Sequence, residues 1–273
     1  MIEIIAFMAA PFVATIAIAL IHVYLGIHIL QREVIFVDLA LAQIAALGTT
    51  VAFFVGLNPE GTASYLFSLG FVVLGAALFS ITRVRNQRVP QEAIIGITYV
   101  VATAAAILVA DRAAGGAEHI KEILTGAVLW VQWPTILQIV VVYVIVGVIH
   151  YALRHHFIDL TERYRTGDLR PVDRLWDFVF YLTFGFVIVL SVRVAGILLV
   201  FSFLVVPTSV ALLFGESWRA RMVIGWSLAA VVTVLGLFLS YVLNSPCGPA
   251  VVVLLGLSLG VLAIGRALVA SRT

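Results

Sequence analysis

The residue best suited to carry out chemistry is Asp38, in the largely apolar segment QREVIFVDLALAQIAALG at 31–48. A carboxylate at a bilayer centre costs roughly 2.5–3.5 kcal/mol on insertion scales, so such a group usually faces a partner, a wet cavity or a transport path. At about 100° per residue, Ala42, Ala45 and Thr49 share a helix face with Asp38 and leave room for close approach. The pattern fits a path-lining role and fits equally well a carboxylate near the headgroups, capped or paired with an arginine, because Asp38 is only six residues past Arg32.

Gln43 and Glu92 are the other two residues that we consider for the same path. Gln43 lies about 140° around the helix from Asp38, so the two side chains cannot point down one narrow pore unless the helix is irregular. Glu92 follows Pro90 at the start of a later apolar segment, where an acidic side chain complements a helix N-terminus. A role in an inner gate is the functional alternative for Glu92.

The composition identifies the class of protein that must position these groups. Hydrophobic residues make up 63% of the 273 residues and charged residues only 11%, against about 45–50% and 25% in soluble proteins. The sequence therefore predicts an integral membrane protein, an all-α bundle that forms one transmembrane domain over 1–273. The single cysteine excludes an internal disulfide and a cysteine-based metal cluster in one chain.

The hydrophobic segments and their breaks predict eight or nine membrane-spanning helices. The segment SVRVAGILLVFSFLVVPTSVALLFG contains Gly196 and Pro207, which predict one broken helix near Pro207. The nine candidate passes cover about 5–30, 34–57, 63–82, 92–110, 134–153, 177–192, 196–214, 222–243 and 249–268.

The arginines predict the orientation, because cytoplasmic ends of membrane helices are enriched in Lys and Arg. Of 16 such residues, 13 fall on one set of alternate helix ends, which places the N-terminus outside and the C-terminus inside the cytoplasmic (inner) membrane. These anchors account for the net charge of +2 without a nucleic-acid partner. The 13 residues are Arg32, Arg83, Arg85, Arg88, Arg154, Arg163, Arg165, Arg170, Arg174, Arg219, Arg221, Arg266 and Arg272.

Two polar segments could contact partners. On the outer side, Glu118, His119 and Glu122 could receive a cation at an entrance, or could form a plain solvated face. On the inner side, the segment 150–178 mixes arginines with acidic residues, which favours a docking surface over a lipid anchor; a solvated loop is the alternative. Its candidate docking residues are Asp159, Glu162, Arg163, Arg165, Asp168, Arg170 and Arg174.

Taken together, four ordered blocks resemble the metal-type ATP-binding-cassette permeases, the membrane subunits of zinc, manganese and iron importers. The blocks are VDLALAQIAALG at 37–48, EAIIGI at 92–97, RVAGILLVFSFLVVPTSVALL at 193–213 and SPCGPAVVV at 245–253. The resemblance implies a homodimeric permease with a divalent metal cation as substrate and no permanently bound cofactor. It also implies two partners, a cytoplasmic ATPase that docks on 150–178 and an extracytoplasmic metal-binding protein.

This sequence departs from the family's pattern at the residues that correspond to the metal site. The family has an Asp and, four residues later, a His that are regarded as metal ligands. Alignment on Gly48 places that His on Gln43 and that Asp on Leu39, with Asp38 displaced by one position. Oxygen ligands suit harder ions better than zinc, which favours manganese or iron.

Two other classes of protein remain as alternatives. A single-chain secondary transporter of a small solute would show paired broken helices in two repeated halves, whereas one break and no clear repeat are evident. An intramembrane enzyme would need clustered ligands or a nucleophile beside a base, and the six histidines form no such pattern. The chain has no phosphate-binding G-x-x-x-x-G-K-[ST] loop, so we expect a transport subunit whose ATP hydrolysis occurs in a partner.

Overall fold

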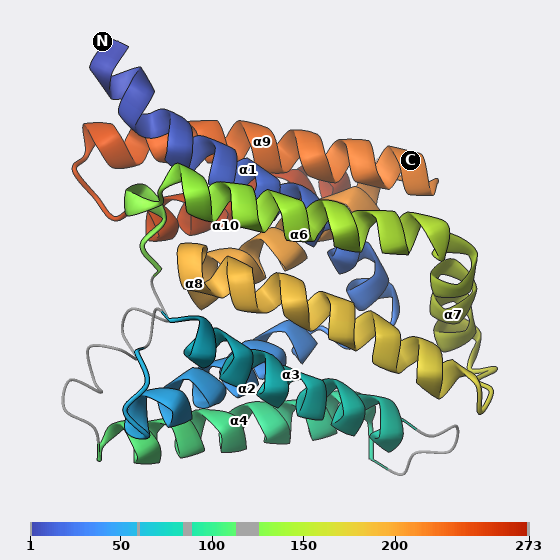
Figure 1. The fold of residues 1–273 in the computed structure, drawn as a ribbon. Helices are drawn as coiled ribbons and strands as arrows, with labels where there is room; N and C mark the ends of the chain where they lie inside the picture. The colour runs from blue at the N-terminus through green and yellow to red at the C-terminus, as the bar shows by residue number, and fades with distance from the viewer. Residues whose placement is uncertain (1, 59–60, 84–88, 113–125, 272–273) are drawn as a thin grey trace. The chain divides into compact units, whose positions relative to one another are not determined.

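The computed structural model describes residues 2–58, 61–83, 89–112 and 126–271, and throughout them the fold is helical without strands. Eight helices are long and apolar enough to cross a membrane, which confirms the predicted polytopic bundle. In chain order the helices are α1 (Ile2–Gln31), α2 (Val37–Phe54), α3 (Thr62–Thr82), α4 (Gln91–Ala110), η1 (Val128–Trp130), α6 (Trp133–Ala152), α7 (Arg154–Thr166), α8 (Asp173–Phe214), α9 (Trp218–Val242) and α10 (Cys247–Ala270) (Figure 1).

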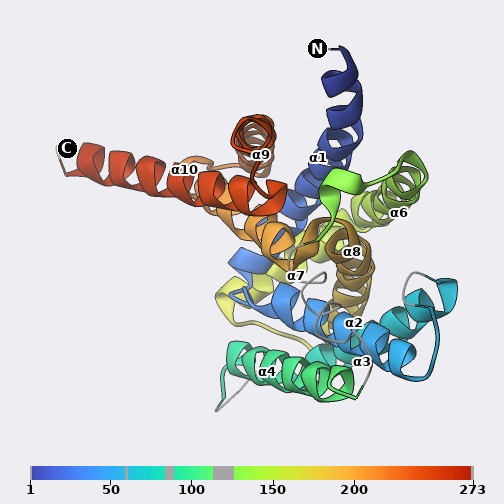
Figure 2. The ribbon, with the colours of Figure 1, turned by 90° about the vertical axis from the view of Figure 1, so that its left-hand side faces the viewer.

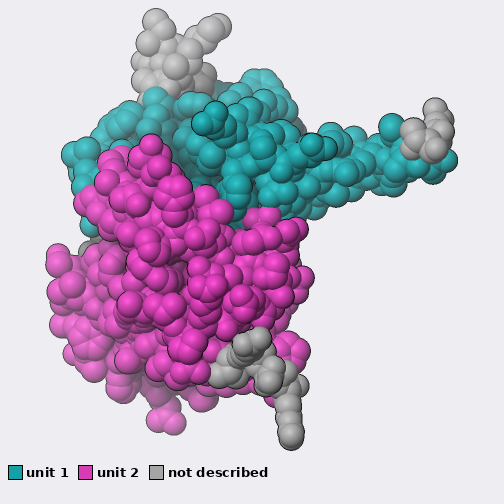
Figure 3. All heavy atoms as spheres, turned by 90° about the vertical axis from the view of Figure 1, so that its right-hand side faces the viewer, with its two compact units in different colours: residues 1–30, 125–141, 194–273 teal, residues 31–124, 142–193 magenta. Residues whose placement is uncertain are grey.

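The chain divides into two compact units, each assembled from segments distant in sequence (Figure 3). Unit 1 comprises 1–30, 125–141 and 194–273, and unit 2 comprises 31–124 and 142–193. The division concerns packing alone, so the single permease domain over 1–273 stays a prediction.

In unit 2, α2 packs against both α3 and α4, and the three helices lie side by side in Figures 1 and 2. Small side chains on α2 permit this close packing. Ser68 of α3 donates a 3.0 Å hydrogen bond to the carbonyl oxygen of Ala45 on α2. This bond fixes α2 against α3 along the face that the sequence predicts to be small.

In unit 1, α1 packs against α9 and the second part of α8, while α10 packs against α9. The indole Nε1 of Trp226 on α9 donates to the carbonyl oxygen of Leu20 on α1 at 2.9 Å. The imidazole of His28, near the end of α1, lies 4.7 Å from the Trp218 ring at the start of α9. Aromatic contacts therefore hold α1 in this unit.

The arginine-bearing helix ends lie together within each unit. In unit 2, the guanidinium carbon of Arg83, just after α3, lies 3.6 Å from the ring centroid of Tyr164 on α7. In unit 1, the guanidinium carbon of Arg266 on α10 lies 5.4 Å from the ring centroid of Phe214, the last residue of α8. Both contacts join ends that the alternation of arginines assigns to one membrane face.

The predicted broken helix is α8, and its interruption is at Gly196. Gly196 has φ 75° and ψ 159°, a combination that side-chain-bearing residues rarely adopt, while Pro207 lies within the helical stretch that follows. The proline removes one backbone donor without ending the helix, so the break is eleven residues before the predicted position. The two helical parts of α8 total 42 residues, a summed helix length of about 63 Å, which is roughly twice the hydrocarbon thickness and suits two crossings.

A short loop in unit 1 packs against this break. Ala127 donates its backbone N–H to the carbonyl oxygen of Val194 at 3.0 Å, which satisfies a group that the break would otherwise leave unpaired. Gly126 has φ 67°, and a Cβ there would overlap the backbone of Ala195 and Gly196. The loop and the break therefore require glycine at both contacting positions.

We predict that Gly126→Ala lowers the free energy of unfolding by about 1–3 kcal/mol, because it combines backbone strain with overlap at the break. Thermal unfolding of the purified protein in detergent measures this. Gly147→Ala is the matched control, because Gly147 lies inside α6 with nothing within 4 Å of an added Cβ, and the control should not be destabilised. Equal unfolding temperatures for Gly126→Ala and the parent would contradict the packing described for the loop.

Candidate functional site

Asp38 lies in the first turn of α2 and is only 1% exposed. Its Oδ1 atom is buried and has no hydrogen-bond partner among the described residues. Arg32, the arginine closest in sequence, forms its ion pair with Asp177 instead. Asp38 is therefore not paired with Arg32, and its place in a metal path stays a prediction.

Gln43 is also buried, with 6% exposure, and it lies in the same regular helix as Asp38. Since α2 is helical from Val37 to Phe54, the separation of about 140° between the two side chains applies. The described residues contain no group of three or more His, Cys, Asp and Glu side chains placed to hold a metal ion. The described part of one chain thus offers a buried carboxylate at Asp38 but not a complete metal centre.

Glu92, at the start of α4, contacts the N-terminal end of α2. Its Oε1 accepts a 3.0 Å hydrogen bond from the backbone N–H of Phe36, the residue before α2. The other oxygen, Oε2, is buried and has no partner among the described residues. Glu92 lies in the first turn of α4, where the sequence predicts that it complements the helix N-terminus, and it also caps α2, two residues before Asp38.

Two hydroxyl groups extend the polar face of α2 away from Asp38. Thr49 lies on the Asp38 face, about 16 Å further along the helix axis, and its hydroxyl contacts that of Ser68 on α3. Sequence reasoning missed Ser68, although Ser64 and Ser68 are four residues apart on one face of an apolar helix, and both are buried. That spacing is the signal that could have identified a polar stripe on α3.

The predicted docking segment contains a short amphipathic helix, α7. Its buried residues recur at helical spacing and form one face: Phe157, Leu160, Thr161 and Tyr164. Gly167, with φ 73°, ends the helix, as glycine commonly does. The hydrophobic face fixes α7 in unit 2, so its opposite face is exposed.

That exposed face carries three of the seven predicted docking residues, Asp159, Glu162 and Arg165, and the chain that follows α7 carries three more. Glu162 and Arg165 are both exposed and form a 2.6 Å ion pair, and hydrogen bonding to Glu162 raises the pKa of Arg165. Such an exposed pair contributes little to stability, so both groups can be given up to a partner. The exposed members of the predicted set are Asp159, Glu162, Arg165, Asp168, Arg170 and Arg174, and Arg163 is half-buried.

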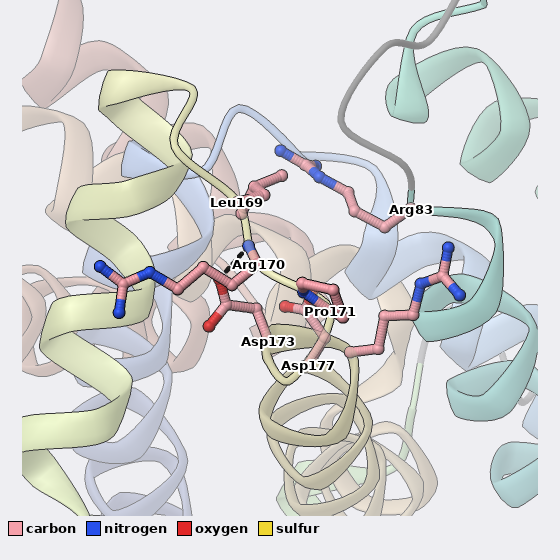
Figure 4. Close-up of a pocket in the computed structure, with 7 residues that line it drawn as sticks. Arg83, Leu169, Arg170, Pro171, Asp173 and Asp177 are labelled. Carbon is pink, nitrogen blue, oxygen red and sulfur yellow. Dashed lines mark hydrogen bonds between the residues drawn. The ribbon is translucent and has the colours of Figure 1, made fainter.

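An open pocket of about 330 Å³ lies beside this face, between the end of α3 and the start of α8 (Figure 4). Asp173 organises its rim: one carboxylate oxygen pairs with Arg163 at 2.5 Å, and the other accepts from the backbone N–H of Arg170 at 2.7 Å. Figure 4 shows the side chain of Arg170 extending away from that of Arg83. The arginines thus do not converge on one ligand, and the pocket belongs to a broad surface rather than to an anion site.

The three residues predicted for an outer entrance, Glu118, His119 and Glu122, lie outside the described residues. Their role stays a prediction.

The comparisons with known proteins give the class. The model of the ABC 3 transport family matches residues 4–265, so nearly the whole chain is covered. The chain belongs to the ABC 3 transport family, which confirms the resemblance predicted from its four sequence blocks.

Two relatives are similar in sequence to this chain over most of its length. The manganese import system permease protein ScaB of Streptococcus parasanguinis is 25% identical over 252 residues, covering 90% of this chain and 86% of the relative. The manganese transport system membrane protein MntC of Listeria monocytogenes is 23% identical over 254 residues, with the same two coverages.

The fold is also that of a solved structure, PsaBC from Streptococcus pneumoniae in complex with Fab. The TM-score is 0.76 at 20% identity, with 94% of this chain and 90% of that chain covered. At this level of identity the likeness establishes the fold alone.

Proposed function

We propose that this chain is the membrane permease of an ATP-binding-cassette importer for a divalent metal cation, with manganese as the substrate. The observation that carries the proposal is Asp38, a buried carboxylate that lacks a described partner in the first turn of α2. A negative charge without compensation in an apolar helix is costly, and a passing cation would supply that compensation. Family membership and the two relatives named for manganese support the same reading.

The choice of manganese follows from the chemistry of the available donors. Asp38 offers carboxylate oxygen atoms, and no described group gathers the nitrogen and sulfur ligands that zinc prefers. Harder ions such as manganese accept carboxylate, carbonyl and water ligands. Since one carboxylate supplies only half the charge of a divalent ion, a second copy in a homodimer would supply the remainder.

We propose that the arginine-bearing ends are cytoplasmic, following the enrichment of Lys and Arg on that side. The N-terminus is then outside and the C-terminus inside the cytoplasmic membrane. A separate ATPase docks on the exposed face of α7 and the pocket beside it, where both charge signs are available. An extracytoplasmic metal-binding protein delivers the ion to the opposite side.

The docking proposal predicts that reversing Asp159 and Glu162 to arginine lowers substrate-stimulated ATP hydrolysis by about tenfold, because two exposed contacts become repulsive. Both residues are exposed, so folding and insertion should be retained. Phosphate release from the complex in proteoliposomes measures the effect. Glu216→Arg is the control, an exposed charge reversal in the loop before α9. If only the control lowered hydrolysis, docking would lie at 215–221 instead.

For the site itself, we predict that Asp38→Asn lowers manganese uptake by about tenfold or more while expression and assembly are unchanged. The amide keeps the shape and one oxygen ligand but removes the charge that compensates the ion. Asp111→Asn, the same change at an exposed position, is the control and should transport normally. Uptake of manganese, zinc and iron is measured for each variant in one membrane preparation.

Gln43→His is the companion variant, because an imidazole nitrogen should move the preference toward zinc if position 43 faces the ion. Normal uptake in Asp38→Asn together with an unmoved preference in Gln43→His would show that α2 is scaffold.

A further inference from the structure

Arg32 is a fully buried arginine in the linker between α1 and α2, and three groups of unit 2 surround it. Its Nε donates to the Thr161 hydroxyl on α7 at 2.9 Å, and one terminal nitrogen donates to the carbonyl oxygen of Phe157 at 3.4 Å. The other terminal nitrogen pairs with Asp177 of α8 at 3.4 Å, and the side chains of this pair are 0% and 2% exposed. Arg32 thus joins the docking helix to the beginning of α2.

Asp177 receives a second hydrogen bond from α7. The Tyr164 hydroxyl donates to the carboxylate oxygen that Arg32 does not use. Burial raises the pKa of Tyr164 well above its ordinary value, so the hydroxyl stays protonated and remains a donor. The guanidinium of Arg83 lies over the Tyr164 ring in a cation–π contact, so the end of α3 joins the same cluster.

The cluster continues toward Asp38 through the backbone. Glu33, next to Arg32, has φ 56°, a left-handed conformation that is uncommon outside glycine and indicates a fixed linker. Glu92 then caps the backbone N–H of Phe36. The hydrogen-bonded cluster on the buried face of α7 therefore joins the first turn of α2 through Arg32 and the four backbone residues that follow it.

Stability alone is a weak reason for such a cluster, because desolvation of a buried ion pair can offset the attraction between its charges. What the pair supplies is a unique geometry, with the direction of each bond fixed by the planar guanidinium. A displacement of α7 must either carry the linker with it or break several bonds in an apolar setting. The arrangement is suited to transmit movement.

We propose that the cluster of Arg32, Tyr164 and Asp177 couples movement of the docking helix α7 to the start of α2, and thereby to the position of Asp38. The inference rests on the proposed function, since it assigns the means by which ATP hydrolysis in the partner changes the metal path. These are positioning residues, which act through α2 rather than by touching the ion.

The test measures manganese uptake and ATP hydrolysis in the same proteoliposomes containing the chain, its ATPase and its binding protein. Tyr164→Phe removes only the hydroxyl and keeps the ring under Arg83, and Asp177→Asn keeps the shape and removes the charge. We expect each variant to lower uptake per ATP hydrolysed by about threefold to tenfold, with the ATPase still bound. A loss of folded protein would lower both activities and leave their ratio unchanged.

Tyr143→Phe is the matched control. The Tyr143 hydroxyl is also buried and hydrogen-bonds Ser191 of α8 at 2.6 Å, but it does not involve α7. The manganese uptake per ATP hydrolysed by Tyr143→Phe should equal that of the parent. With folded complex present at the parental level, parental ratios in both cluster variants, or loss of ATPase binding, would overturn the inference. Absence of ATP-driven uptake by the parent complex would instead overturn the proposed function itself.

Discussion

The cost of burying charge in an apolar helical bundle is the constraint on which this structure depends, and two carboxylates of unit 2 meet it differently. Asp177 is compensated by Arg32 and by the Tyr164 hydroxyl, so it is fully committed to the fold. Asp38 is equally buried, and its Oδ1 has no partner among the described residues. One carboxylate therefore organises helix ends, and we propose that the other receives a positively charged substrate.

Buried backbone groups also need partners, because an unpaired carbonyl or N–H in hydrocarbon is costly. The break at Gly196 is tolerated where Ala127 donates to Val194 and Gly126 fits against the exposed backbone. At the start of α2, Glu92 satisfies an N–H that the helix itself cannot pair. Irregular backbone thus occurs where a neighbouring segment supplies the missing hydrogen bond.

Much of the fold follows from local sequence signals. The apolar segments predict the spans, and the arginines predict which helix ends lie together. The isolation of Asp38 in an apolar segment marks it as a candidate for the transport path. The sequence predicts the break but places it near Pro207, because a proline removes a backbone donor from a helix. The helix continues through Pro207 and is interrupted at Gly196, where glycine readily adopts the observed angles. The partners of buried polar groups were not predictable, because they join residues far apart in sequence. Arg32 with Asp177, and Glu92 with Phe36, are examples of such long-range pairing.

The proposed transport function depends on a metal ion contacting Asp38. Anomalous diffraction at the manganese edge, on crystals of the assembled transporter grown with manganese, locates the ion directly. We predict an anomalous peak in direct contact with the Asp38 carboxylate of α2. A strong peak elsewhere in the membrane region, with Asp38 bound to no metal, would contradict it.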